Sequence, residues 1–343
     1  MTIVADNYRF VTGVDTHSQK HQYALMDYTG RLIAERSFPA NPAGNSRAAH
    51  WLHEATGGQA LLAAIDGAGS YGRQLAESLT GAGVRVVEAP HIRYRPAGKD
   101  DRIDARTAAT AVLPMDIERL ADRKAGPERD AIQILLTART DMTRERTQAI
   151  NALNALTRRF DLGIDTRRAL TATQITRIAA WRTRSSDAID TRTARAEAIR
   201  LATRIRALTT DINRNKTELA GWTTTLAPQL IAEPGIGPVS AAQFLASWSH
   251  PGRIHSEAAF ARLAGVAPKP ASSGNKTQHR LDRGGDRRLN AALHRVIMTR
   301  WRSHPETLAY AARRRADGDT DRNIRRSLKR LLARHIYRLL ENG

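Results

Sequence analysis

Residues 10–38 read FVTGVDTHSQKHQYALMDYTGRLIAERSF, a series of apolar stretches separated by short polar segments. The pattern predicts three consecutive strands, at 10–15, 22–26 and 32–38, with Tyr28-Thr29-Gly30 in the turn between the last two. The first of these strands ends in a carboxylate, Asp15. These residues therefore predict a sheet that carries an acid at the end of its opening strand.

The residues that follow continue the same α/β pattern. We expect a helix at 46–54, a buried strand at 61–65 that stops at Asp66, a helix at 71–80 after a glycine-rich turn, and a strand at 84–87. Three strands followed by helix, strand, helix and strand is the order of a ribonuclease-H-like sheet. The first third of the chain is thus predicted to be an α/β domain of that class.

Four acids stand out in a chain of net charge +20. Asp15 and Asp66 each end an apolar strand, and Asp101 and Asp104 share one face of a predicted helix. Carboxylates that converge repel one another unless a divalent cation lies between them, and Mg²⁺ takes oxygen ligands. Two such ions about 4 Å apart commonly serve phosphodiester chemistry. Asp101 and Asp104 also fit a simpler role, as acids near the positive end of a helix, and Asp100 is expected to point away from them.

The positive charge is concentrated near the C-terminus. Residues 1–112 carry 12 Lys+Arg against 11 Asp+Glu, a net charge of +1, whereas residues 280–338 carry 17 against 6, a net charge of +11. All but one of those 17 are Arg, whose planar guanidinium suits phosphate. Together with a pI of 11.2, this distribution favours nucleic acid as the partner over a merely solvated basic surface.

The composition excludes several classes of protein. With 343 residues, 41 % of them hydrophobic, the chain can form two or three domains with cores of their own. It has no cysteine, which excludes disulfides and cysteine-ligated zinc and fits a reducing cytoplasm. We expect neither a signal peptide nor a membrane span, because the N-terminus lacks the signal pattern and no apolar run approaches about 18 residues.

The middle of the chain, about 127–226, is polar and poor in glycine. Apolar residues recur there every seven positions in two series: Leu135, Met142, Ala149 and Leu156, then Ile205, Ile212, Leu219 and Leu226. Such heptads predict two long helices in a coiled coil, within the chain or between protomers, and a plain helical bundle is the alternative. Arg139 and Arg146 interrupt the first series, so the pairing is expected to be loose.

The last third begins with Glu233-Pro234-Gly235-Ile236-Gly237-Pro238 and a small-residue helix start at 239–242. Two glycines around an apolar residue before a helix resemble a helix-hairpin-helix, whose backbone N–H groups and helix dipole can meet a phosphate. Any tight turn between helices can have a similar sequence. The remainder of the chain is predicted to be mainly α-helical and rich in arginine.

Seven short sequence motifs occur along the chain in an order that resembles that of a known protein family. They are Gly13-Val14-Asp15, Asp66-Gly67-Ala68-Gly69-Ser70-Tyr71-Gly72, Gly98-Lys99-Asp100-Asp101-Arg102-Ile103-Asp104-Ala105, Pro234-Gly235-Ile236-Gly237-Pro238, Gly265-Val266-Ala267-Pro268, Ser272-Ser273-Gly274 and Arg283-Gly284-Gly285-Asp286-Arg287-Arg288. Together they resemble the DEDD-type insertion-sequence transposases of the "one-ten" family, over nearly the whole chain. The resemblance implies a RuvC-like domain at 1–125, a coiled-coil region at 126–228 and a C-terminal transposase domain with a catalytic serine at 229–343.

The resemblance also implies roles for individual residues. The family's first acid falls on Asp15, its second on Asp66 and its paired acids on Asp101 and Asp104, and these four catalytic acids would hold Mg²⁺ or Mn²⁺. The family usually has Glu at the second position, so the shorter Asp66 must approach the metal more closely. The serine falls in Ser272-Ser273-Gly274, where we favour Ser273 as the nucleophile because of its flexible neighbour, and Ser272 stays open.

Basic residues surround the predicted nucleophile. We expect them to hold the nucleic-acid strand and to neutralise charge in the transition state: Lys276, Arg280, Arg283, Arg287 and Arg288. A solvated basic face is the alternative. Because aromatic residues make up only 5 % of the chain, contacts to the sugar–phosphate backbone rather than base stacking should dominate the affinity.

Taken together, the resemblance implies a DNA transposase or recombinase of an insertion sequence. It would cut and rejoin DNA through a phosphoserine intermediate, guided by a structured bridge RNA, as a homo-oligomer (dimer or tetramer) at the nucleoid in the cytoplasm. Two alternatives stay open. One is a RuvC-like, structure-selective DNA nuclease that uses metal-activated water, and the other is a non-catalytic nucleic-acid-binding protein.

Overall fold

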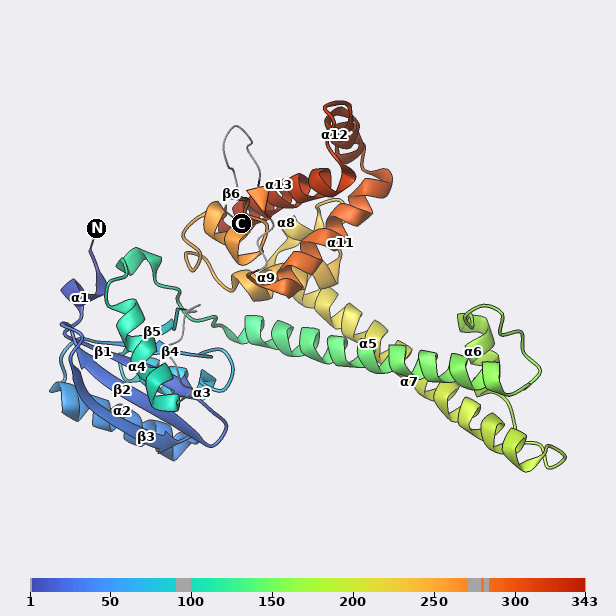
Figure 1. Ribbon diagram of the computed structural model, residues 1–343, viewed down its shortest axis with the longest axis horizontal. Coiled ribbons are helices and arrows are strands. Elements are labelled where there is room, and N and C mark those ends of the chain that lie inside the picture. The colour runs from blue at the N-terminus through green and yellow to red at the C-terminus, as the bar shows by residue number, and fades with distance from the viewer. Residues whose placement is uncertain (1, 91–99, 271–278, 281–283, 343) are drawn as a thin grey trace. The chain divides into compact units, whose positions relative to one another are not determined.

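The computed structural model describes residues 2–90, 100–270, 279–280 and 284–342. The chain divides into two compact units, one made of residues 1–126 and 247–263 and the other of residues 127–246 and 264–343. Figure 1 shows the elements of both. Among the helices described, none is both long and apolar enough to span a bilayer.

The first unit is built on a five-stranded mixed sheet of order β3-β2-β1-β4-β5. Its strands are β1 (Phe10–Thr16), β2 (Lys20–Asp27), β3 (Leu32–Pro39), β4 (Leu61–Ile65) and β5 (Arg85–Glu88). The first three pair antiparallel in sequence order, whereas β4 lies parallel to both β1 and β5. All five strands expected from the sequence are confirmed, and so is the α/β class of the N-terminal part.

Helices cover both faces of this sheet (Figure 1). They are α1 (Val4–Asn7), α2 (Pro42–Thr56), α3 (Arg73–Gly81), α4 (Asp101–Val112) and the 3-10 helix η1 (Ile117–Arg119). The first unit also contains α10 (Glu257–Leu263). On one face α2 and α3 bury Leu52 and Leu75 against Val14. On the other face α4 buries Ala109 and Val112 against Val11. Alternate residues of β1 therefore serve two separate apolar cores.

Gly13 lets α4 lie directly against β1. A Cβ at Gly13 would come within 2.0 Å of the carbonyl oxygen of Ala105 and 2.5 Å of the backbone nitrogen of Ala109. Both are backbone atoms of α4, so no side chain can move aside to make room. Asp15 lies two residues further along β1, on the same face of the sheet, and it therefore meets the first turn of α4.

The second unit contains a long helical hairpin. It is formed by α5 (Pro127–Arg159) and α7 (Ile189–Leu226), with α6 (Ala172–Ala179) packed near its tip (Figure 1). Polar contacts cross between the two long helices. Arg139 Nη1 donates to the carbonyl oxygen of Ile212 at 2.8 Å, Asn215 Nδ2 donates to that of Leu135 at 3.0 Å, and Arg204 pairs with Glu145. The pairing is antiparallel and lies within one chain.

The heptads located the seam of the hairpin on α7 better than on α5. Ile205, Ile212 and Leu219 are buried, but Leu226 is 39 % exposed and does not belong to the seam. On α5 the predicted series holds only at Ala149, because the buried residues are Ile132, Leu136, Ala149, Leu153 and Thr157 together with Arg129. On either side of the interval between Leu136 and Ala149, the buried positions of α5 follow one another at three or four residues, as one face of a helix does, and the predicted series began one residue before the buried Leu136.

The C-terminal part of the second unit is helical, as predicted. Its helices are α8 (Pro228–Ile231), α9 (Pro238–Trp248), α11 (Arg287–Ser303), α12 (Pro305–Ala316) and α13 (Asp321–Asn342), and two short strands, β6 (Lys269–Pro270) and β7 (His279–Arg280), pair antiparallel. Gly235, in the turn before α9, has φ +79°. Arg300 fixes this turn by donating to the carbonyl oxygen of Pro234 at 2.7 Å and to Glu233 Oε2 at 3.0 Å.

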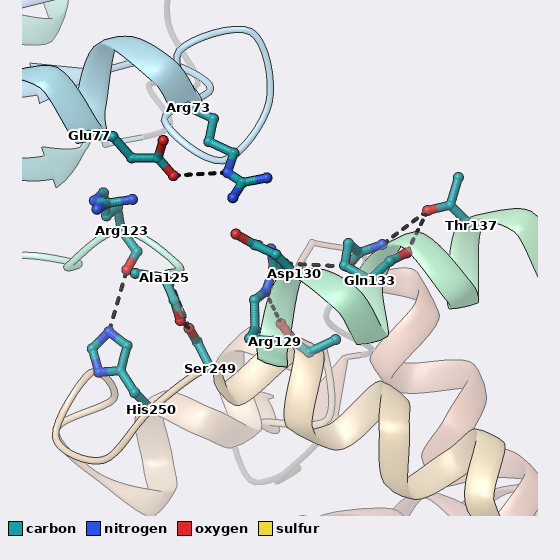
Figure 2. A network of polar contacts seen from close by, with 11 residues as sticks. Arg73, Glu77, Arg123, Ala125, Arg129, Asp130, Gln133, Thr137, Ser249 and His250 are labelled. Atoms are coloured by element: carbon teal, nitrogen blue, oxygen red, sulfur yellow. Dashed lines mark hydrogen bonds and ion pairs between the residues drawn. The ribbon is translucent and has the colours of Figure 1, made fainter. Parts of the chain in front are cut away.

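The residues after α9 return to the first unit. Ser249 Oγ donates to the carbonyl oxygen of Ala125 at 3.1 Å and accepts from the backbone nitrogen of the same residue at 3.0 Å. His250 lies beside the carbonyl oxygen of Arg123, and Arg253 Nε donates to that of Asp122 at 2.9 Å. Figure 2 shows Ser249 and His250 at these partners. Two segments more than 120 residues apart in the sequence are therefore joined within the first unit.

Candidate metal centre

Asp15 is the buried acid of the site. It lies at the carboxyl end of β1 with 6 % of its surface exposed, and its Oδ2 is 2.9 Å from His17 Nε2. Burial raises the pKa of Asp15, the adjacent His17 lowers it, and the charges of Asp104 and Asp101 raise it. A carboxylate in this position gains from any cation that lies beside it.

The first turn of α4 brings the paired acids to Asp15. Asp100 is the N-cap of this helix, and its side chain accepts a hydrogen bond from the backbone nitrogen of Arg102. Asp101 and Asp104 follow in the first turn, and Asp101 Oδ1 lies 3.3 Å from His17 Nε2. Asp100 therefore caps the helix, while the first turn that it caps carries Asp101 to His17.

Asp15, His17 and Asp101 form a group that can hold a metal ion. One ligand atom of each lies within 4.8 Å of the others, and no other such group of three occurs among the residues that the structure describes. Carboxylate oxygens suit Mg²⁺ and Mn²⁺, and an imidazole nitrogen suits zinc and iron. The donor set of this group is thus compatible with a divalent metal ion.

Asp66 lies at the neighbouring strand end, outside this group of three. Its backbone nitrogen donates to the carbonyl oxygen of Val14 at 2.9 Å, and its own carbonyl oxygen accepts from Thr16 Oγ1 at 2.7 Å. The backbone is thus tied to β1, but the residue is exposed. Its carboxylate charge acts on Glu88, at the end of β5.

Two further residues at this edge of the sheet were not predicted. His17 bridges Asp15 and Asp101 from the turn just after β1. A histidine this close in sequence to a strand-end acid was a signal that could have been noted. Glu88 is the last residue of the parallel strand β5, where a strand-end acid could have been noted. Burial raises the pKa of Glu88, the charges of Lys124 and Arg253 lower it, and that of Asp66 raises it.

The predicted nucleophile lies outside the described residues, together with part of the basic set: Ser272, Ser273, Lys276 and Arg283. The structure describes the strands on either side, in which Pro270 is the register partner of His279 and Lys269 that of Arg280. Arg287 and Arg288 are exposed and open α11, where the N-cap Asp286 accepts from the backbone nitrogens of Arg288 and Leu289.

Two family models match successive parts of the chain. A model described as "Transposase", for the DEDD transposases of IS110 elements, matches residues 12–160, which include the sheet, α4 and α5. A second, described as "Transposase IS116/IS110/IS902 family", matches residues 227–312, from α8 into α12. No curated protein matches the chain. The acids Asp15, Asp66, Asp101 and Asp104 fall within the first match, and the serines fall within the second.

Proposed function

Because the chain is a DNA transposase with the domains of the IS110 family, we propose that it cuts and rejoins DNA at a site made of the β1–α4 acids and a serine. The observation that carries this proposal is the close approach of Asp15 and Asp101 around His17, inside the part matched by the DEDD model. The strand order and the mixed pairing of the sheet support a RuvC-like interpretation of the first unit. We also interpret the α5–α7 hairpin as the coiled coil of the family.

The acids of the site are assigned to Mg²⁺ or Mn²⁺. Asp15, Asp101 and Asp104 would hold the ion from β1 and α4, and Asp66 would complete the set from the end of β4. A divalent ion supplies Lewis-acid activation of a phosphodiester when it is bound. The protein's part is to keep Asp15 buried, so that its carboxylate stays in place, and to fix the first turn of α4 with the Asp100 cap.

Ser273 is assigned the attack on DNA. Its Oγ would bond to the scissile phosphorus, the P–O bond to one DNA strand would break, and the leaving hydroxyl would take the proton that the serine loses. The phosphoserine ester conserves the energy of the broken bond, so rejoining requires no external energy source. Support comes from the position of Ser272-Ser273-Gly274 inside the second family match.

We propose that a structured bridge RNA selects the DNA sites that are cut and rejoined, and this part of the proposal rests on the resemblance alone. Base pairing between RNA and DNA would then carry the sequence information, while the protein contacts shape and backbone. The net charge of +11 in residues 280–338 supports backbone contact. The same interpretation makes the working form a dimer or tetramer at the nucleoid.

A covalent adduct tests the proposal most directly. Wild-type protein with Mg²⁺ and its element DNA should form an adduct that survives a denaturing gel, and mass spectrometry should place it on Ser273. Ser273→Ala should lose the adduct and keep DNA binding, because one hydroxyl contributes little to an interface dominated by charge. An adduct on Ser272 would move the assignment by one residue.

Cleavage without an adduct would favour the alternative function. The Asp15–His17–Asp101 group needs no serine to bind a metal ion, and this observation supports a nuclease that hydrolyses DNA with metal-activated water. In that case Ser273→Ala should cleave DNA at the wild-type rate. DNA binding with no metal-dependent cleavage would leave the non-catalytic binding protein as the interpretation.

A further inference from the structure

A cavity of about 610 Å³ lies in the second unit, beside the N-terminus of α9. Helices α5, α7 and α11 contribute its other walls. The residues that matter for its chemistry are Arg139, Lys216, Pro238, Ser240, Arg288 and Arg295. They come from three distant parts of the chain, so the fold and not a local run of arginines assembles the cavity.

Among the residues that the structure describes, four cations and no acid line the cavity. Arg139 comes from α5, Lys216 from α7, and Arg288 and Arg295 lie seven residues apart, on one face of α11. Burial, and then the positive charges of Arg146 and Arg295, lower the pKa of Arg139. Cations that repel one another in this way are stabilised by an anion that lies among them.

The structure does not pair these cations with carboxylates. Arg139 donates only to uncharged acceptors, the carbonyl oxygen of Ile212 at 2.8 Å and Asn215 Oδ1 at 3.4 Å. Among the described residues, Lys216 and Arg295 have no acidic partner either. Other arginines of the same unit do, since Arg195 pairs with Asp187 at 2.7 Å and Arg300 with Glu233 at 3.0 Å. Arg139, Lys216 and Arg295 are therefore available to a ligand.

The chemistry of the walls indicates the kind of anion. The N-terminus of the 11-residue helix α9 adds a partial positive charge to the same space. Ser240 adds a hydroxyl, and none of the described lining residues is aromatic, so these walls offer no surface on which a base could stack. Arginine forks, an ammonium group and a helix N-terminus together suit phosphate oxygens.

We propose that this cavity binds a phosphate group of a nucleic-acid backbone, and that it extends the contact surface of the basic residues around the serine, to which Arg288 also belongs. The proposal rests on the proposed function, which supplies DNA and RNA as ligands that share a phosphodiester. It gives the base of the α5–α7 hairpin a role in holding nucleic acid, through Arg139 and Lys216.

Charge-matched variants test the proposal. Lys216→Gln/Arg295→Gln removes two cations from the cavity, and Arg192→Gln/Arg206→Gln removes two exposed cations from α7 outside it. Both variants are titrated with single-stranded DNA and with RNA over a range of salt concentrations. The cavity variant should bind about tenfold more weakly than the control, because one charge-assisted contact to phosphate is lost. The slope of log K against log[salt] should also be smaller by about 1 than that of the control.

The two ligands separate the possible sources of the phosphate. A loss confined to DNA assigns the cavity to DNA, a loss confined to RNA assigns it to RNA, and either result supports the proposal. Equal affinities and equal salt slopes for the cavity variant and the control would contradict phosphate binding in the cavity. The proposed function would not be affected by that result. A wild-type protein that binds neither ligand would overturn both.

A cross-link gives a second, independent measurement. The chain has no cysteine, so Thr299→Cys places a single thiol at the wall of the cavity, and Ser303→Cys places one on the same helix outside it. An oligonucleotide with a thiol-reactive group tethered to its phosphates should attach to Thr299→Cys several-fold faster than to Ser303→Cys. Equal rates would contradict binding in the cavity.

Discussion

Gly13 decides where the paired acids lie, because it removes the side chain that would separate β1 from α4. The nearest backbone atoms of α4 leave no room for a methyl group, at 2.0 Å and 2.5 Å from the place of a Cβ. Helix α4 can therefore approach until Asp101 shares His17 with Asp15. The glycine of Gly13-Val14-Asp15 is thus part of the site, although it offers no ligand atom.

Gly13→Ala should therefore displace α4 and disrupt the metal centre together. We expect a loss of about 3 kcal/mol or more in the free energy of unfolding, because the clash is with backbone atoms. Denaturant unfolding checks this value. Gly69→Ala is the control, since a Cβ there meets nothing within 4 Å. An alanine tolerated equally at both positions would contradict the close approach of α4.

Asp15→Asn and Asp101→Asn should abolish the stabilisation that Mn²⁺ gives to the wild-type protein. A metal bound only by the folded state raises the melting temperature, and each change removes a charged ligand. Asp100→Asn is the control, because asparagine also caps a helix and Asp100 does not belong to the group. Thermal unfolding with and without Mn²⁺ measures all three. If Mn²⁺ raised the melting temperature of Asp15→Asn as much as that of the wild-type protein, the metal would not be bound at the end of β1.

Local patterns predicted two members of the Asp15–His17–Asp101 group, and the reasons are physical. A strand end and a helix turn fix where Asp15 and Asp101 lie along their own elements, and the packing of α4 on β1 brings the two together. His17 and Glu88 were missed because their meaning depends on neighbours across the sheet. Asp66 was predicted from its strand end, but the strand end does not determine how far its side chain reaches.

At the scale of whole elements, the ion pair Arg195–Asp187 secures the tip of the hairpin. The two side chains are 6 % and 14 % exposed and lie 2.7 Å apart, at the start of α7. Arg195 also lies over the ring of Trp181, 5.2 Å from its centroid. The loop before α7 is thus held by a buried charge that has one acidic partner.

Asp187→Asn should loosen this tip. It leaves the Arg195 guanidinium buried without its carboxylate, at a cost of about 3 kcal/mol. Amide hydrogen exchange in α6 and in the first turns of α7 should speed up accordingly. Asp165→Asn is the control, because its pair with Arg167 is exposed and should leave exchange unchanged. Unchanged exchange in Asp187→Asn would mean that the pair does not anchor the tip.

The hairpin also illustrates what a repeat can and cannot predict. The heptads predicted two long helices and the buried face of α7, because an apolar stripe must be covered wherever it lies. They did not predict α6 or the seam of α5. Arg139 and Asn215 occupy that seam as a polar pair, and only the partner helix determines that Asn215 accepts from Arg139. A polar pair of this kind favours one register of the two helices.

At the scale of the whole molecule, charge should govern affinity. The net charge is +20, concentrated toward the C-terminus, so binding to DNA should weaken steeply with salt. Six phosphate contacts would lower the affinity about 10³-fold between roughly 50 and 200 mM salt. Fluorescence anisotropy of labelled DNA measures the slope, and circular dichroism at the same salt concentrations checks that the fold is intact. A flat titration would contradict binding through the backbone.

The return of residues 247–263 to the first unit has a consequence during synthesis. The N-terminal α/β segment leaves the ribosome early, but Ser249, His250 and Arg253, which bind its last residues, are made more than 120 residues later. At about 5–20 residues per second, this delay is on the order of ten seconds. During this delay, residues 121–125 lack the hydrogen bonds that Ser249, His250 and Arg253 later provide. The first unit is therefore begun first and completed only after the hairpin has been translated.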